Sequence, residues 1–154
     1  HPLAFYAAYF SIRAKAFDLR IMTGDLKTQM TEFNRIKALD RAASPKDKDL
    51  MSALEVSMEM YQRGYRFINV DIQHSEARRF SIKDGALLPP FLAIDSLGET
   101  VADAIVAERE ERPFTSLKDL QRRCKVSNTI IDLMKDLKCC GELPEDEQMS
   151  LFGA

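Results

Sequence analysis

The residues best suited to do chemistry in this sequence lie around one glycine, Gly98. Residues 91–109 read FLAIDSLGETVADAIVAER, so Gly98 stands between two apolar segments that have helical spacing. A glycine can adopt a positive φ in a tight turn and lets the backbone approach a ligand closely. The N–H groups that begin the following helix are free, and the helix dipole favours an anion beside them. We therefore predict that the backbone binds a phosphate at Ser96, Leu97, Gly98, Glu99 and Thr100.

This arrangement resembles a helix-hairpin-helix motif, and it leaves two interpretations open. A phosphate contact of this kind would position a nucleic acid without reading its sequence. Gly98 could instead simply end a helix, because glycine is strongly enriched there. Many such motifs carry a second glycine, whereas Glu99 and Thr100 follow Gly98 here. The carboxylate of Glu99 would then lie near the phosphate.

A second, degenerate copy of the pattern is expected in residues 114–138, FTSLKDLQRRCKVSNTIIDLMKDLK. Two helices would be joined by residues 124–126, and Ser127 would cap the second helix. Lys125, Ser127 and Asn128 could then contact the backbone of the other strand of a duplex. An ordinary helical pair that completes a core explains the same residues equally well, because capping residues serve both purposes.

A short apolar motif lies in an acidic segment near the end of the sequence. Residues 141–154 contain four acidic residues and no Lys or Arg, so we expect a flexible, solvated tail. Within it, Gln148, Met149, Ser150, Leu151 and Phe152 resemble the pentapeptide with which bacterial proteins bind the sliding clamp. A few buried anchors, here Leu151 and Phe152, can supply most of such an interface's binding energy. The alternative is that the terminal Leu-Phe pair folds back onto the body of the protein.

Other kinds of site are not expected in this chain. Cys124, Cys139 and Cys140 form no C-x-x-C pair, and the two histidines are His1 and His74, so neither disulfides nor a zinc site are predicted. No Ser/His/Asp arrangement or glycine-rich phosphate loop stands out. No apolar run reaches the roughly 20 residues of a membrane span. The sequence predicts reduced thiols and no catalytic residue, metal site or cofactor in this chain.

The net charge does not by itself indicate a nucleic-acid-binding protein. The formal net charge is -2, but residues 141–154 carry four of the 24 acidic residues. Without that segment, 22 basic residues face 20 acidic ones, so the rest of the chain is slightly basic. Binding to nucleic acid would therefore depend on placed backbone donors and a few cations, not on a broad basic field.

Hydrophobic periodicity predicts the helices that must position these residues. Helices are expected over residues 2–16 and 25–42, and a third between Ser44, a natural N-cap, and Gly64, a natural terminator. Further helices follow residue 91, with a break at Pro113 and N-caps at residue 115 or 116 and at residue 127.

One segment departs from the helical pattern. Residues 65–72 and 79–88 contain short alternating runs rich in aromatic and β-branched residues, which favour strands. Asp84 and Gly85 indicate a turn between two of them. We therefore expect a two- or three-stranded β element within a mainly α fold, which is an α+β class.

The whole chain resembles the C-terminal end of the PolC-type DNA polymerase III alpha subunit of low-GC Gram-positive bacteria. The resemblance is carried, in order, by HPLAFYAAYFSIRA, ASPKDKDL, RGYRFINVDI, LLPPFLAIDSLGE, KVSNTIIDLMKDL and LPEDEQMSLF. It implies four parts: the last helices of the polymerase fingers in 1–64, a small β element and linker in 65–90, a tandem helix-hairpin-helix domain that binds duplex DNA in 91–140, and an acidic tail that binds the clamp in 141–154.

The resemblance also implies what the parent protein does. It would be a DNA-directed DNA polymerase, a nucleotidyltransferase of the cytoplasm with a proofreading exonuclease. Aspartates of its palm would hold Mg²⁺, and that palm lies upstream of this sequence. The chain starts with His1 rather than Met, so we expect a fragment. Its partners would be duplex DNA, the β sliding clamp and the upstream polymerase domains.

Two other functions remain open at this point. The chain could be a free-standing repair or recombination protein with a helix-hairpin-helix domain, although no catalytic residues of its own are found. It could also be an interaction domain in which the hairpin is purely structural. Binding to duplex DNA at two salt concentrations would separate this last possibility from the polymerase fragment.

Overall fold

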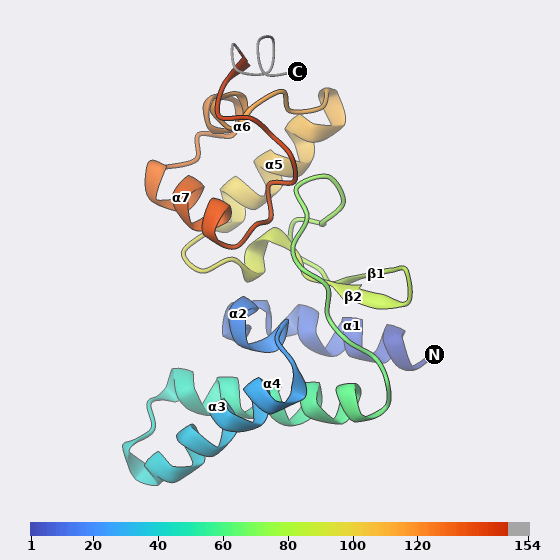
Figure 1. Ribbon diagram of the computed structural model, residues 1–154, viewed down its shortest axis with the longest axis vertical. Helices are drawn as coiled ribbons and strands as arrows, with labels where there is room; N and C mark the ends of the chain where they lie inside the picture. Colours follow the sequence, from blue (N-terminus) through green and yellow to red (C-terminus); the bar gives the residue numbers. More distant parts are fainter. Residues whose placement is uncertain (148–154) are drawn as a thin grey trace.

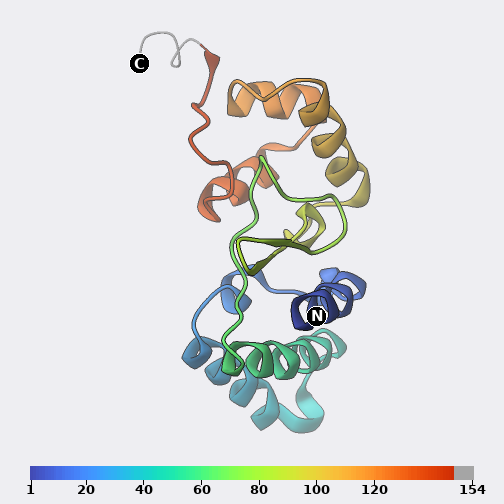
Figure 2. The same cartoon turned by 90° about the vertical axis from the view of Figure 1, so that its right-hand side faces the viewer.

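The computed structural model describes residues 1–147, which form two helical lobes joined by a small β-hairpin and extended linkers (Figures 1 and 2). The N-terminal lobe contains α1 (Pro2–Ile12), the 3-10 turn η1 (Ala14–Ala16), α2 (Leu19–Met22), α3 (Leu26–Leu39), η2 (Asp40–Ala42) and α4 (Pro45–Gln62). The C-terminal lobe contains η3 (Phe91–Ala93), α5 (Glu99–Glu111), α6 (Leu117–Cys124) and α7 (Asn128–Asp136). The class is mainly α with a small β element, as predicted.

Local sequence signals explain the ends of the longest helix, α4. Ser44 and Asp47 form a capping box, in which each side chain accepts from the backbone N–H of the other, and Pro45 occupies the first helical position. These contacts satisfy N–H groups that the helix itself leaves free. At the other end, Gly64 has φ of +90°, so it ends the helix in a conformation that costs glycine little.

The β element has two strands, within the two or three that were predicted. Strands β1 (Ser81–Lys83) and β2 (Ala86–Leu88) pair antiparallel, with Lys83 opposite Ala86. Asp84 and Gly85 have φ of 52° and 73°, as a two-residue turn with both central residues left-handed requires.

Residues 65–72 form no strand of their own, which corrects the prediction. Phe67 alone makes an isolated parallel bridge to Leu87. Beyond it, the segment turns to the C-terminal lobe: the Asn69 side chain donates to the Leu137 carbonyl, and the Ile72 N–H donates to the Cys139 carbonyl at 2.9 Å. The alternating pattern arises because the segment is extended and half-buried, while its hydrogen bonds are shared between the sheet and a helical lobe.

A continuous hydrophobic core joins the two lobes. At the junction, the rings of Phe10, Phe17, Phe67 and Phe80 lie against one another, with centroids 4.8–6.2 Å apart and mostly edge-to-face. These rings come from α1, from the chain after η1 and from the two ends of the linker between α4 and β1, so the cluster fixes that linker against the N-terminal lobe. Edge-to-face pairs add about 0.5–1.5 kcal/mol each beyond the area they bury.

The acidic segment is held against the rest of the protein up to residue 147. The backbone carbonyls of Pro144 and Glu145 accept from the N–H groups of Leu117 and Lys118 at 2.8 and 3.1 Å, which covers the start of α6. The Glu145 carboxylate also pairs with Lys135. The prediction of a flexible tail is therefore wrong for residues 142–147, because free N–H groups of a helix start offered them hydrogen bonds that no local pattern reveals.

Candidate nucleic-acid interface

The first predicted turn has the expected place in the fold but a different strained residue. The chain leaves η3 at Ile94, turns through Asp95 and Ser96, and enters α5 after Gly98; the Leu97 N–H donates to the Ile94 carbonyl at 3.2 Å. Ser96 has φ of 66°, whereas Gly98 has φ of −82° and ψ of 171°. The prediction that Gly98 supplies the positive φ is wrong: Ser96 does, in a region that costs a residue with a Cβ about 1–2 kcal/mol.

Gly98 has another role, as the residue that precedes the first turn of α5. It is the N-cap and contributes no side-chain hydrogen bond to the helix. A Cβ built on Gly98 would meet no atom within 4 Å, and Gly98, Glu99 and Thr100 are all exposed. The first turn of α5 therefore lacks a side-chain cap and begins at exposed residues, where an anion can approach its free N–H groups. Leu97 is 2% exposed and anchors the turn in the core.

The charge of Glu99 beside this opening is partly neutralised. Arg78, from the loop before β1, lies 3.5 Å from the Glu99 carboxylate and makes two hydrogen bonds to Asp103, one turn further along α5. The hydrogen bond from Arg78 lowers the pKa of Asp103. The carboxylate that seemed out of place in the sequence is thus held beside a cation, although both side chains remain about half exposed.

The second predicted turn resembles the first in its last three residues. Lys125 has φ of 57°, Val126 is 4% exposed, and Ser127 begins α7 with φ of −69° and ψ of 158°. The order is the same as at residues 96–98: a left-handed residue, a buried apolar residue and an extended N-cap. The structure therefore contains two similar turns, each leading directly into a helix N-terminus.

The two turns differ in how their helix starts are satisfied. At the second, the Ser127 hydroxyl accepts from the Ile130 N–H, and the Asn128 side chain accepts from Gln121 at 2.6 Å. Ser127 and Asn128 are therefore already engaged within the turn, while Lys125 is exposed and forms no ion pair with any residue in 1–147. No hydrogen bond or ion pair of the described residues joins the two turns directly.

Comparison with known families shows what these turns are. A family model described as a helix-hairpin-helix motif matches residues 64–148, which is more than half of the chain. The chain belongs to this helix-hairpin-helix family. We call the turn at residues 94–98 hairpin 1 and the turn at residues 124–127 hairpin 2.

Individual relatives confirm the resemblance seen in the sequence. Proteins named DNA polymerase III PolC-type are 42% identical in Caldanaerobacter subterraneus subsp. tengcongensis, 44% in Streptococcus suis and 43% in Streptococcus pyogenes. Each match covers 99% of this chain. The chain spans only about a tenth of the length of these relatives, 11% in the first and 10% in the others.

A buried ion-pair network holds the helix-hairpin-helix lobe together. Arg123 of α6 bonds the carboxylates of Glu108 and Asp119 at 3.2 and 3.1 Å and stacks on the ring of Phe114. It also donates to the carbonyls of Glu108 and Arg112 at the end of α5. Glu108 lies in α5, the helix after hairpin 1, and Arg123 lies in α6, the helix before hairpin 2. The Arg123 side chain therefore fixes the two hairpins relative to each other.

Asp119, the partner of Arg123, is a fully buried carboxylate. Burial would raise its pKa, but the hydrogen bonds from the Thr115 backbone and from Arg123 outweigh that effect, and the pKa is lowered. A depressed pKa means that the folded state favours the ionised form. Sequence reasoning missed this pair because a charged residue in a Lys- and Arg-rich helix is usually solvated.

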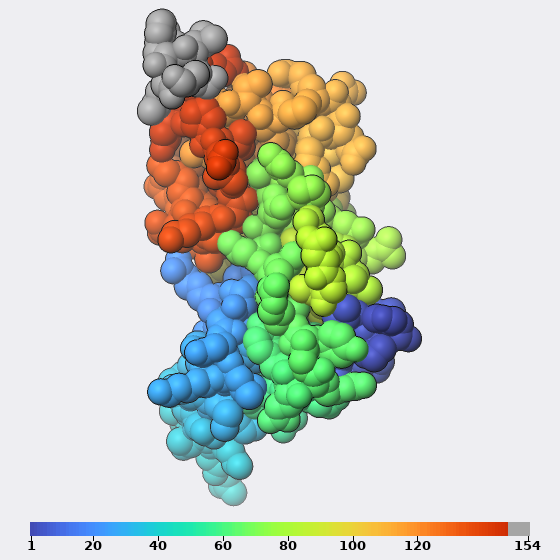
Figure 3. Space-filling view, turned by 45° about the vertical axis from the view of Figure 1, so that its right-hand side comes forward, coloured from blue at the N-terminus to red at the C-terminus, as the bar shows by residue number. Residues whose placement is uncertain are grey.

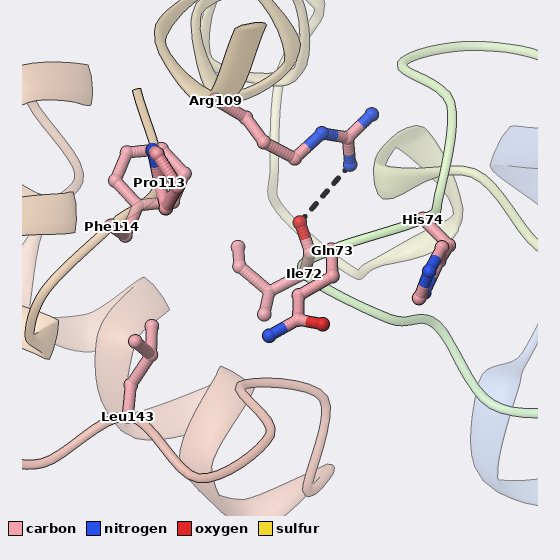
Figure 4. Close-up of a pocket in the computed structure, with 7 residues that line it drawn as sticks. All are labelled: Ile72, Gln73, His74, Arg109, Pro113, Phe114 and Leu143. Atoms are coloured by element: carbon pink, nitrogen blue, oxygen red, sulfur yellow. Dashed lines mark hydrogen bonds between the residues drawn. The ribbon is translucent and has the colours of Figure 1, made fainter.

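Arg109 of α5 connects the helix-hairpin-helix lobe to the linker between α4 and β1. The Arg109 guanidinium donates to the carbonyls of Ile72 and Ser75 at 3.0 and 2.9 Å, at the edge of a cavity of about 360 Å³ (Figure 4). His74, whose ring is held by Asp71 at 2.7 Å, lies apart from Arg109 and Phe114 in that view. Because both carbonyls accept from Nη1 of Arg109, this side chain ties the segment at residues 72–75 to α5.

The described residues hold no grouping suited to other chemistry. Cys124, Cys139 and Cys140 are buried and free, and burial raises the pKa of Cys124 to about 11. Within residues 1–147, no group of three or more His, Cys, Asp or Glu side chains could hold a metal ion. In the same range, no helix combines the length and apolar character that crossing a membrane requires. The clamp-binding motif, residues 148–152, lies outside the described residues.

Proposed function

We propose that this chain is the C-terminal, duplex-DNA- and clamp-binding part of a PolC-type DNA polymerase III. One observation supports DNA binding above all: the helix that follows hairpin 1 begins with an uncapped, exposed glycine whose surroundings are open. The identity of 42–44% over nearly the whole chain supports the polymerase context. The membership in the helix-hairpin-helix family supports nucleic acid as the ligand.

Hairpin 1 would bind DNA through its backbone. The free N–H groups of residues 99 and 100 would donate to a phosphate that approaches past Gly98, and the helix dipole of α5 would add to the attraction. Such a contact reads no base, so it suits a protein that must hold any sequence. Hairpin 2 would contribute the exposed cation of Lys125, because its hydroxyl and amide side chains already bond within the turn.

The chemical step belongs to other parts of the proposed polymerase. Nucleotidyl transfer, the Mg²⁺ ions that assist it and the proofreading exonuclease would be supplied by residues outside this chain. The upstream polymerase domains are therefore proposed as partners. This chain would act by holding the duplex and the sliding clamp, which keeps the template near an active site that it does not contain.

Duplex binding is tested by changing Gly98. Its φ of −82° suits any residue, so Gly98→Val should fold, but the branched side chain would stand over the N–H groups. In fluorescence anisotropy with duplexes of two unrelated sequences, we expect Gly98→Val to weaken binding of both by the same factor, about tenfold. Gly98→Ala, with a smaller side chain, should lie between it and the wild type. Equal affinities in all three folded proteins would leave hairpin 1 a purely structural element.

Clamp binding is proposed for Gln148, Met149, Ser150, Leu151 and Phe152 on the residue pattern alone. Burial of a Leu or Phe side chain stabilises a complex by roughly 1.5–3 kcal/mol, so these two anchors could support micromolar binding after ordering costs. A titration of the β sliding clamp should therefore show most of the affinity lost in Leu151→Ala/Phe152→Ala. Glu142→Gln, an exposed change in the same segment, serves as the control and should bind normally. Equal binding by the double variant would mean that the clamp contacts another surface.

A free-standing repair protein is the second candidate function. The helix-hairpin-helix family supports its DNA binding equally well. The two candidates differ in the clamp and in the protein context. Loss of clamp binding on changing residues 151 and 152 would favour the polymerase, and cleavage of DNA by this chain alone would favour the repair protein.

A further inference from the structure

A groove runs along the junction between the N-terminal lobe and the helix-hairpin-helix lobe. It has a volume of about 200 Å³, and its walls come from η1, α2 and the start of α4 on one side and from Ala93, Asp95 and α7 on the other. Figure 3 shows the lighter blue segment, which follows the dark-blue N-terminal helix, lying directly below the orange-red segment. Asp95 directly precedes Ser96, so the groove begins at hairpin 1.

Three exposed cations line this groove: Lys15 of η1, Arg20 of α2 and Lys46 of α4. None of them forms an ion pair with a residue in 1–147. The groove also has two carboxylates. That of Asp18 caps α2 by accepting from the Ile21 N–H, and that of Asp95 is exposed at the turn. The uncompensated charge of this surface is therefore positive.

Two adjoining hollows extend the same surface. One, of about 670 Å³, shares Lys15 and Lys46 with the groove, and the other, of about 500 Å³, shares Arg20 and adds Arg66. Arg66 likewise makes no ion pair within the described residues. The acids Asp49 and Asp136 line these hollows too. The free cations thus follow a continuous path across the junction and do not gather at one point.

The helix-hairpin-helix lobe itself offers few cations for DNA. Of its basic residues, Arg112, Lys118, Arg122, Arg123 and Lys135 are paired with carboxylates, and Arg109 is bonded to carbonyls. Lys125 and Lys138 are left without an ion pair among residues 1–147. Each phosphate that a protein neutralises adds to its affinity for DNA, so two cations and one helix start make a weak site. A duplex held at hairpin 1 would need cations from beyond this lobe.

We propose that the groove lined by Lys15, Arg20 and Lys46 is a second binding site for the phosphate backbone of the duplex that hairpin 1 holds. The inference rests on the proposed DNA binding and assigns it a further surface, contributed by the N-terminal lobe. Flexible, exposed Lys and Arg side chains contact phosphates as charges without fixing sequence. The duplex therefore spans both lobes, and the junction between them is part of its binding surface.

The test compares two triple variants of the whole chain that lose the same charge. Lys15→Gln/Arg20→Gln/Lys46→Gln removes the groove cations. Lys27→Gln/Lys37→Gln/Arg41→Gln removes three exposed, unpaired cations from α3 and η2, none of which lines the groove or its two adjoining hollows. Duplex affinity is measured for both and for wild type over a range of salt concentrations. We expect the groove variant to reduce the salt slope by about 1 for each lost phosphate contact and the α3 variant to leave it nearly unchanged.

The outcomes separate this inference from the proposed function. In one outcome, wild type binds duplex, Gly98→Val weakens that binding, and both triple variants keep the salt slope of wild type. The groove site is then wrong, whereas the contact at hairpin 1 is supported. If both triple variants lose slope equally, the effect is general charge and the groove site is again wrong. If wild type binds no duplex at all, the proposed function itself fails. A duplex in which neutral methylphosphonates replace the phosphates beyond the hairpin contact should bind wild type more weakly than the normal duplex does. The groove variant should bind the two duplexes with equal affinity.

Discussion

At the residue scale, hairpin 1 depends on a serine that the sequence gives no reason to suspect. Ser96 has φ of 66°, and a Cβ in that region costs about 1–2 kcal/mol, whereas glycine adopts it freely. Glycine also gains more entropy on unfolding, which offsets part of the gain. Ser96→Gly should therefore raise the free energy of unfolding by up to about 1 kcal/mol in urea titrations while duplex affinity stays unchanged.

Hairpin 2 offers the matched change, because Lys125 also has a positive φ, of 57°. Lys125→Gly should give a similar gain in the free energy of unfolding but should weaken duplex binding, since it also removes an exposed cation. If Ser96→Gly destabilised the chain, the hydroxyl would have to make a contact that outweighs the backbone strain. If Lys125→Gly bound duplex normally, hairpin 2 would not contribute a phosphate contact.

At the element scale, one buried ion pair decides how the two hairpins sit together. Arg123 has 7% of its side chain exposed, and its partner Asp119 has none. Removal of one member of a buried pair costs about 3–5 kcal/mol when the other charge loses its only partner, but Asp119 would keep Arg122 at 2.9 Å, which sets that range as an upper bound. Arg123→Gln should lower the free energy of unfolding by up to about that amount. Arg122→Gln is the control: this neighbour also contacts Asp119 but is 65% exposed, so its loss should cost less than about 1 kcal/mol.

The same pair predicts how stability depends on pH. The folded pKa of Asp119 is lowered, so its contribution is fully present above the ordinary carboxyl pKa of about 3.9 and is lost as pH falls through the lower, folded value. The difference in the free energy of unfolding between wild type and Asp119→Asn should therefore be constant from pH 5 to pH 7 and shrink below about pH 4. A difference that persisted unchanged to lower pH would show that Asp119 acts by shape and not by charge.

The elements that could be predicted are those whose causes are local. The cap at Ser44, the terminator at Gly64 and the turn at Asp84 and Gly85 each follow from a few neighbouring residues, and each is present. The positive φ at Ser96 was assigned to Gly98, because residue preference is a weak guide when the fold imposes the conformation. The bonds of Asn69 and of residues 144–145 depend on partners distant in the sequence, which periodicity cannot show.

At the scale of the whole molecule, the proposed DNA surface needs the two lobes to keep a fixed arrangement. Hairpin 1 belongs to one lobe, and the three groove cations belong to the other. The aromatic cluster joins the N-terminal lobe to the linker between α4 and β1. The hydrogen bond from Ile72 to Cys139 joins that linker to the C-terminal lobe. Because the core is continuous across this boundary, the sequence divisions at residues 64 and 90 need not be boundaries of independent folding; those divisions stay a prediction.

The positions of the tyrosines and cysteines allow a test of whether the two lobes unfold together. The tyrosines lie at positions 6, 9, 61 and 65, in or next to the N-terminal lobe, and the cysteines lie at positions 124, 139 and 140, in the other lobe. Tyrosine fluorescence and thiol labelling therefore report on different ends of the chain. If the continuous core makes one cooperative unit, the two signals should change at the same urea concentration.

Phe67→Ala, which empties the centre of the junction cluster, should lower that midpoint for both probes, because it lowers the free energy of unfolding by about 3–5 kcal/mol. Thiols that become reactive well before the tyrosine signal changes would show that the helix-hairpin-helix lobe opens by itself, and a rigid surface spanning both lobes could then form only when DNA is bound.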